Sequence, residues 1–227
     1  MRSIVTMYSG EKGDKLRAIT EKRHLIYANK CSAVLRIIGG RISTSLSVLM
    51  MQKMEYVSSL LQKGERVLWI DGDILIHRDS PNLFDVVPTG RFAAFNEGSL
   101  CNDHQIYERC SHIVQTCHEE GLPIPEIHRR YFNMGMFMAE RHHAGLFAPR
   151  KTYSNHNWCE QSLINIRMIQ DGVMPVSLPE CFNRFVYWGP KPDKYEQSSY
   201  FLHYAGPASP EVREHDMKVR SEKWGDL

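Results

Sequence analysis

The first 76 residues alternate between short apolar segments and longer amphipathic ones, and this alternation restricts the fold more than any other feature. The predicted strands are 3–8, 33–38 and 66–70, and the predicted helices between them are 15–30 and 44–62. The second helix ends at Lys63-Gly64. A β-α-β-α-β order implies a parallel sheet covered by helices.

The remaining chain is less regular but contains both kinds of element. We expect a loop with a short helical turn at 78–88, strands at 91–95, 131–139 and 173–177, and helices at 103–121 and 159–171. The tail from Pro207 is polar, and its thin apolar face favours a solvated helix over one that contacts a membrane surface or a partner. No repeat or linker divides the 227 residues, so we expect one α/β domain spanning 1–227.

Composition excludes several classes of protein. With 28 basic and 26 acidic residues the net charge is +2, which gives no reason to expect binding to nucleic acid. No apolar run approaches the ~20 residues that span a bilayer, and the N-terminal apolar stretch is too short for a signal peptide. We therefore expect a cytoplasmic protein, although a domain taken from a longer chain would look the same.

The six cysteines form no C-x-x-C pair, and we expect them to be reduced thiols. The segment 101–118 combines three cysteines with three histidines, which raises the alternative of a zinc site. Its spacings match no common zinc pattern. An amphipathic helix is favoured, with an inner face of Ile106, Cys110, Ile113, Val114 and Cys117.

Two aspartates interrupt the apolar run VLWIDGDILIH at 67–77. A buried strand does not tolerate two charges one residue apart unless something compensates them. Asp71 follows the strand 66–70, at the sheet edge where α/β proteins bind ligands. Asp71 and Asp73 point to the same side, about 7 Å apart at Cα, so both can approach one Mg²⁺ or Mn²⁺. The alternative is that Asp-Gly marks a turn between two short strands.

Three further segments follow LWIDGD (68–73) in the chain: YFNMGMFM (131–138), NWCEQSLIN (157–165) and FLHYAG (201–206). In this order they resemble the D-x-D, F-N-x-G, W…[DE]-Q…[LI] and V-H-F-x-G motifs of metal-dependent GT-A glycosyltransferases. The resemblance extends from residue 3 to about 206 and is strongest to retaining members, the glycogenin-like and the xylosyl- and galactosyltransferase-like families. It implies a single GT-A, Rossmann-like domain with a mixed, mostly parallel central sheet flanked by helices.

The same resemblance implies transfer of a hexose or pentose from a nucleotide-sugar, a UDP-sugar, to an acceptor hydroxyl with retention of anomeric configuration. Mn²⁺ or Mg²⁺ would neutralise the diphosphate leaving group. The expected partners are the donor and a glycan or other hydroxyl acceptor. Two alternatives remain. One is a nucleotidyltransferase-like sugar-nucleotide enzyme, although YSGEKGDK is no recognised phosphate loop. The other is a non-catalytic domain that binds a sugar nucleotide or a glycan.

The resemblance also implies residue roles. The implied metal ligands are Asp71, Asp73 and His203. The implied catalytic residues are Asp71, Asp73, Glu160 and Gln161. The implied donor and cofactor contacts are Thr6, Tyr8, Lys53, Asp71, Gly72, Asn133, His203 and Gly206. Front-face attack, with the leaving phosphate as the base, would explain retention without a nucleophilic carboxylate.

Several of these residues could instead have a purely structural role. His203 alone would be a satisfied core histidine, and Lys53 a solvated helical lysine. Tyr8 is expected to stack on or hydrogen-bond uracil, with Tyr27 nearby or simply buried. Asn133 is expected to bind sugar hydroxyls, with Gly135 allowing close backbone approach. The candidate acceptor contacts are Trp158, Tyr187, Trp188, Arg129 and Arg130.

Overall fold

The structure is a computed structural model that describes residues 1–40, 46–126, 130–149, 159–187 and 198–225. Its main sheet has the strand order β2-β1-β3-β6-β5-β7. These strands are β1 (Arg2–Ser9), β2 (Val34–Gly40), β3 (Arg66–Ile70), β5 (Ala93–Asn96), β6 (Phe132–Ala139) and β7 (Val176–Ser177). Only the β3–β6 and β5–β6 pairs in this sheet are antiparallel. All of its strands except β6 therefore run in one direction, and the expected mixed, mostly parallel sheet is confirmed.

A second sheet, of order β4-β9-β8, accounts for the interrupted apolar run. Its strands are β4 (Ile74–Ile76), β8 (Arg184–Phe185) and β9 (Phe201–His203). The predicted strand 66–70 is β3, and the chain leaves the main sheet at Asp71. The Asp71 amide donates to the Gly135 carbonyl at 2.7 Å, and the Ile74 amide then donates to the Asp71 carbonyl at 3.1 Å. The alternative of a turn between two short strands is correct for the backbone.

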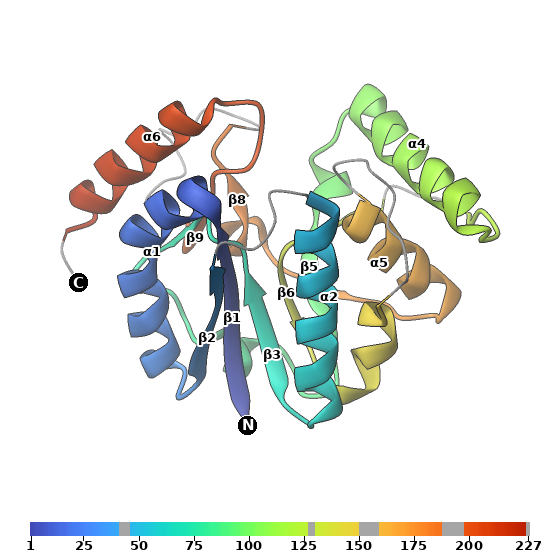
Figure 1. Cartoon of the computed structure of the whole chain (residues 1–227), viewed down its shortest axis with the longest axis horizontal. Coiled ribbons are helices and arrows are strands. Elements are labelled where there is room, and N and C mark those ends of the chain that lie inside the picture. The colour runs from blue at the N-terminus through green and yellow to red at the C-terminus, as the bar shows by residue number, and fades with distance from the viewer. Residues whose placement is uncertain (41–45, 127–129, 150–158, 188–197, 226–227) are drawn as a thin grey trace.

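Six α-helices and three short 3₁₀ helices complete the described chain. The α-helices are α1 (Gly10–Lys30), α2 (Leu46–Gln62), α3 (Leu83–Val86), α4 (Asp103–Glu120), α5 (Cys159–Gln170) and α6 (Pro210–Lys223). The 3₁₀ helices are η1 (Glu97–Ser99), η2 (Arg141–Phe147) and η3 (Glu180–Phe182). In Figure 1, α1 and α6 lie together on one side and α4 and α5 on the other. No helix in these described ranges is long and apolar enough to cross a membrane.

The main sheet is buried on both faces. Along β3, Val67 and Trp69 belong to a hydrophobic cluster with α2 and α5, whereas Leu68 and Ile70 belong to a second cluster with α1. This alternation explains why the strand is apolar throughout rather than at every second position. The polar end of β3 is therefore the point where a charged site can form.

The N-terminus of α1 begins earlier than predicted. The predicted helix begins at residue 15, but α1 already starts at Gly10, directly after Ser9 at the end of β1. A Cβ on Gly13 would lie 2.7 Å from the Tyr8 carbonyl carbon, so the helix approaches the end of β1 too closely for a larger residue. Gly13 is thus needed for close packing of the helix on the strand, whereas Gly10 has a φ of +64° and no neighbour within 4 Å of an added Cβ.

The polar tail forms α6 and packs against the body of the protein. Met217 is fully buried with Leu75, Leu202 and Tyr204. The Arg23 side chain on α1 donates hydrogen bonds to the Ser221 hydroxyl and carbonyl and to the Gly225 carbonyl. The prediction of a solvated helix is therefore wrong, because α6 packs on α1 and on the second sheet.

Candidate metal and donor site

The structure brings together the three residues predicted as metal ligands. Asp71 and Asp73 lie in the turn between β3 and β4, and His203 ends β9, which pairs antiparallel with β4. One ligand atom from each residue lies within 4.8 Å of the others. His203 Nε2 is 3.4 Å from Asp73 Oδ1. Among the residues that the structure describes, no other group of three acidic, cysteine or histidine side chains has this arrangement.

Two glycines make room for the cluster. A Cβ on Gly135 would lie 2.4 Å from His203 Cε1 and 2.9 Å from Asp71 Oδ2. A Cβ on Gly72 would lie 2.8 Å from the Tyr8 ring and 2.9 Å from the Met7 carbonyl oxygen. Distances below 3.0 Å are not tolerated in packed structures. Both positions therefore require glycine because of close approach rather than an unusual φ.

Lys53 and Trp69 hold one oxygen of Asp71. Trp69 Nε1 donates to Asp71 Oδ1 at 2.6 Å, and Lys53 Nζ lies 3.8 Å from the same oxygen. Lys53 is 4% exposed and donates to the Met134 carbonyl at 2.7 Å and to Glu160 Oε1 at 2.8 Å. The solvated-lysine alternative is wrong, because Lys53 is a buried cation that bridges two carboxylates. Asp71 Oδ2 lies on the side of Gly135 and His203.

Burial and mutual charge set the protonation of the cluster. Burial raises the pKa of Asp71, and Lys53 only partly opposes this effect. Burial also acts to raise the pKa of Asp73, but His203 and Arg213 outweigh it, so that this pKa is lowered. Burial acts to lower the pKa of His203, but Asp73 outweighs it and the pKa is raised. Two carboxylates and one imidazole, packed around glycine, form a donor set that fits Mn²⁺ or Mg²⁺.

Behind the cluster lies a buried layer of amides. Gln161 Oε1 accepts from the Met134 amide at 2.9 Å and from Asn133 Nδ2 at 3.3 Å. Asn133 Nδ2 also donates to Glu97 Oε2, while its Oδ1 accepts from the Gly135 amide and from Asn183 Nδ2. Asn133 thus has protein partners for its donors and its acceptor. Protein partners therefore satisfy this amide, and its contact with sugar hydroxyls stays a prediction.

Sequence reasoning missed Glu97 and Asn183. Glu97 is 1% exposed and accepts from Arg109 Nε at 2.8 Å, and Asn183 is fully buried beside His203. A signal for Glu97 was available, because it follows the predicted strand 91–95 at the ligand-binding edge of the sheet. Asn183 lies in a short irregular segment with no periodicity that indicates its burial.

The side chains of Thr6 and Tyr8 are not open to a base. Thr6 is fully buried, and Tyr8 is 3% exposed. The Tyr8 hydroxyl lies 2.8 Å from the Thr20 hydroxyl and 3.1 Å from His24 Nδ1. The prediction that Tyr8 stacks on uracil is therefore corrected. Its ring instead supports the turn at Gly72, because α1 covers the end of β1.

The remaining candidate contacts have different positions. Tyr27 is a core residue that donates to the Pro81 carbonyl, which agrees with the alternative that it is simply buried. The Tyr187 hydroxyl donates to Asp216 on α6. Arg130 lines a separate cavity beside Phe132 and Met174. Trp158, Trp188 and Arg129 lie outside the described residues.

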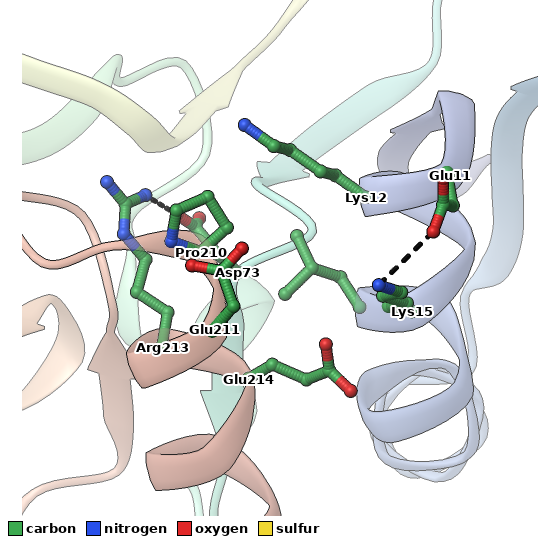
Figure 2. A pocket seen from close by; sticks show the side chains of 9 residues that line it. Glu11, Lys12, Lys15, Asp73, Pro210, Glu211, Arg213 and Glu214 are labelled. Atoms are coloured by element: carbon green, nitrogen blue, oxygen red, sulfur yellow. Dashed lines mark ion pairs between the residues drawn. The ribbon is translucent and has the colours of Figure 1, made fainter.

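A cavity of about 320 Å³ opens beside Asp73, between the start of α1 and the start of α6. Figure 2 shows Glu11, Lys12 and Lys15 on α1 facing Arg213 and Glu214 on α6. Arg213 Nη1 lies 3.8 Å from Asp73 Oδ2, and the same side chain donates to the carbonyl of Gly206. The cavity lining therefore combines three cations with four carboxylates, of which Glu11 pairs with Lys15 at 3.2 Å and Asp73 also belongs to the cluster with Asp71 and His203. Lys12, Lys15 and Arg213 were not predicted from the sequence.

Comparison with known proteins identifies the fold. Residues 42–143, a range that includes Lys53, Asp71, Asp73, Glu97 and Asn133, match the sequence model of glycosyl transferase family 8. A solved glycosyltransferase involved in the glycosylation of the major capsid of PBCV-1 superposes with a TM-score of 0.64. The alignment covers 96% of this chain and 98% of that one, at 12% identity. The chain has a GT-A type glycosyltransferase fold.

Another solved structure, the WbbM bifunctional glycosyltransferase, is similar over 98% of this chain, with a TM-score of 0.53 and 14% identity. The alignment covers 51% of the WbbM chain, so the GT-A type chain described here spans about half of that protein. No curated protein sequence matches this chain.

Proposed function

We propose that this chain is a metal-dependent glycosyltransferase that moves a hexose or pentose from a UDP-sugar to an acceptor hydroxyl with retention of anomeric configuration. The observation that carries the proposal is the cluster of Asp71, Asp73 and His203 beside a cavity that Asp73 lines together with the cations Lys12, Lys15 and Arg213 and the acidic residues Glu11, Glu211 and Glu214. A nucleoside diphosphate leaving group needs this combination, because its negative charge develops as the sugar bond breaks.

Each residue of the cluster has a defined task in this proposal. Asp71, Asp73 and His203 would hold the cation, while Trp69 and Lys53 hold Oδ1 of Asp71 in place. A bound Mn²⁺ or Mg²⁺ supplies Lewis acidity toward the diphosphate. Lys12 and Arg213 are the cations of the cavity lining that could meet the phosphates, since Lys15 is paired with Glu11.

Lys53 supports a mechanism without a covalent intermediate. Glu160 is the acidic member of the predicted pair Glu160 and Gln161. Lys53 Nζ lies 2.8 Å from its Oε1. A carboxylate held in a buried ion pair is a poor nucleophile, and the neighbouring Gln161 is a neutral amide. We therefore infer front-face attack, in which the acceptor hydroxyl gives its proton to the leaving phosphate. Glu160 and Gln161 then shape the donor-sugar side of the site.

The test is metal-dependent release of nucleotide. The protein is incubated with a panel of UDP- and GDP-sugars and Mn²⁺, with and without EDTA. We expect release from a UDP-sugar that EDTA abolishes, and Asp73→Ala should lower it by about 10²–10³-fold, the usual cost of removing an electrostatic stabiliser. Asp79→Ala is the matched control, because Asp79 lies six residues away with a side chain that is 71% exposed.

Asp79→Ala should keep wild-type turnover, and circular dichroism should show that both variants fold. Release that persists in EDTA and in Asp73→Ala, at the level of the Asp79→Ala control, would overturn the proposal. Release of nucleotide from a GDP-sugar and from no UDP-sugar would overturn the assignment of uracil as the nucleobase of the donor.

A further inference from the structure

Two buried asparagine side chains connect His203 to β6 and to the ion pair of Glu97 with Arg109. His203 Nδ1 lies 2.9 Å from Asn183 Oδ1, and Asn183 Nδ2 lies 3.1 Å from Asn133 Oδ1. Asn133 in turn accepts a hydrogen bond from the Gly135 amide and donates one to the Glu97 carboxylate. We call Asn133 and Asn183 the amide pair. Both are buried, at 4% and 0% exposure, so their orientation depends on their protein neighbours.

Two neighbours of known polarity fix the orientation of Asn133. The Gly135 amide N–H can only donate, and it lies 2.9 Å from one end of the Asn133 side chain, which must therefore be the oxygen. The Glu97 carboxylate, held by Arg109 Nε at 2.8 Å, accepts at the other end, which must therefore be the NH₂ group. Both constraints give the same orientation.

The orientation of Asn133 determines the next two groups. Since Asn133 presents its oxygen to Asn183, the Asn183 atom at 3.1 Å must be the NH₂ group. The oxygen of Asn183 then faces His203 Nδ1 at 2.9 Å. An amide oxygen only accepts, so His203 Nδ1 must carry a proton.

We propose that Asn183, oriented by Asn133, is the positioning residue that holds His203 as its Nδ1–H tautomer. Nε2, the nitrogen on the side of Asp73, is then the atom that binds the cation. The Phe185 ring stacks on the imidazole at 5.0 Å between centroids and holds its plane. Hydrogen-bonded partners of this kind set the tautomer and basicity of metal-binding histidines. The inference rests on the metal site of the proposed function.

The tautomer is measured directly by long-range ¹H–¹⁵N NMR of the uniformly labelled protein, with and without Mg²⁺, at a pH where the ring is neutral. We expect His203 to show a protonated Nδ1 and an unprotonated Nε2 in the wild type. An Nε2–H tautomer in the wild type would overturn the inference, whatever the variants do.

Two variants test the role of Asn183, with Mn²⁺ affinity measured by electron paramagnetic resonance. Asn183→Ala removes the acceptor, and we expect a mixture of tautomers with a 10- to 100-fold weaker affinity. Asn183→Asp keeps an acceptor for Nδ1 but loses the donor to Asn133, so the Nδ1–H tautomer should persist. Wild-type affinity and tautomer in Asn183→Ala would contradict the role. If that variant does not fold, loss of the Nδ1–H tautomer in Asn183→Asp would contradict it.

These readouts separate the inference from the proposed function. A wild-type protein that binds no Mn²⁺ and releases no nucleotide would overturn the proposed function, while its NMR spectrum would still report the tautomer. A protein that binds Mn²⁺ and turns over with His203 in the Nε2–H form would retain the function and lose the inference.

Discussion

Gly135 makes room for the cluster of Asp71, Asp73 and His203. A methyl group at this position would lie 2.4 Å from His203 Cε1, and His203 is 2% exposed with Phe185 stacked on its ring. Overpacking of this kind typically costs about 1–3 kcal/mol. We expect Gly135→Ala to lower stability by this amount in urea denaturation and to weaken Mn²⁺ binding by at least about tenfold.

Gly145→Ala is the matched control for this substitution. An added Cβ at Gly145 has no described neighbour within 4 Å, and its φ is not positive. We expect this variant to stay within about 0.5 kcal/mol of the wild type and to bind Mn²⁺ normally. Equal effects of the two substitutions would contradict the role assigned to Gly135.

Asp71 and Asp73 were predictable from their position after the strand 66–70, and His203 from the motif that FLHYAG resembles, whereas the surroundings of these residues were not predictable. Asp71, Asp73 and His203 follow or end apolar strands, and the structure brings them together. Tyr8 also ends a strand, yet α1 begins immediately after it and covers its ring. Strand periodicity does not say which neighbouring element covers a side chain. It therefore could not predict that α1 buries the ring of Tyr8, or which protein groups would bind Asn133.

At the scale of elements, periodicity predicted most of the main sheet and its helices but not the second sheet. The bounds of β3 and α4 agree with prediction to within one residue. The separation of β4 from β3 depends on pairing with β9, more than 120 residues later in the chain. Contacts between such distant segments leave no local pattern in the sequence.

The docking of α6 depends on one fully buried side chain. Met217 packs with Leu75, Leu202 and Tyr204 beneath the helix, and its burial fixes the end of α6 that delivers Arg213 to Asp73. Truncation of a buried methionine typically costs about 2–5 kcal/mol. We expect Met217→Ala to lower the unfolding free energy by an amount in this range, measured by urea denaturation.

Val219→Ala on the same helix is the control, because Val219 is 49% exposed and should change stability by less than about 0.5 kcal/mol. A loss of stability in Met217→Ala no greater than that of the control would show that α6 is not anchored through Met217.

At the scale of the whole molecule, stability should depend on pH through histidines that are buried without charge. Burial lowers the pKa of His24 to about 4, and His143 is lowered to about 4 for the same reason. In the unfolded chain these groups have a pKa of about 6.5. Between about pH 6.5 and 4 the unfolded state therefore binds more protons than the folded state, so stability falls as the pH falls. His203, with its raised pKa, is protonated in both states over the lower part of this window and adds little slope there.

His24 alone accounts for up to about 3 kcal/mol of this loss, since a shift of one pKa unit corresponds to about 1.4 kcal/mol. Its ring is fixed as a neutral group, with Nε2 2.8 Å from the Ile74 carbonyl and Nδ1 3.1 Å from the Tyr8 hydroxyl. We expect urea denaturation at pH 7.5, 5.5 and 4.5 to show a shallower fall in His24→Gln than in the wild type, by about one proton. His104→Gln, at an 81% exposed side chain, should keep the wild-type slope. If His24→Gln kept that slope as well, the acid sensitivity would have to come from groups other than this histidine beneath the Asp-Gly-Asp turn.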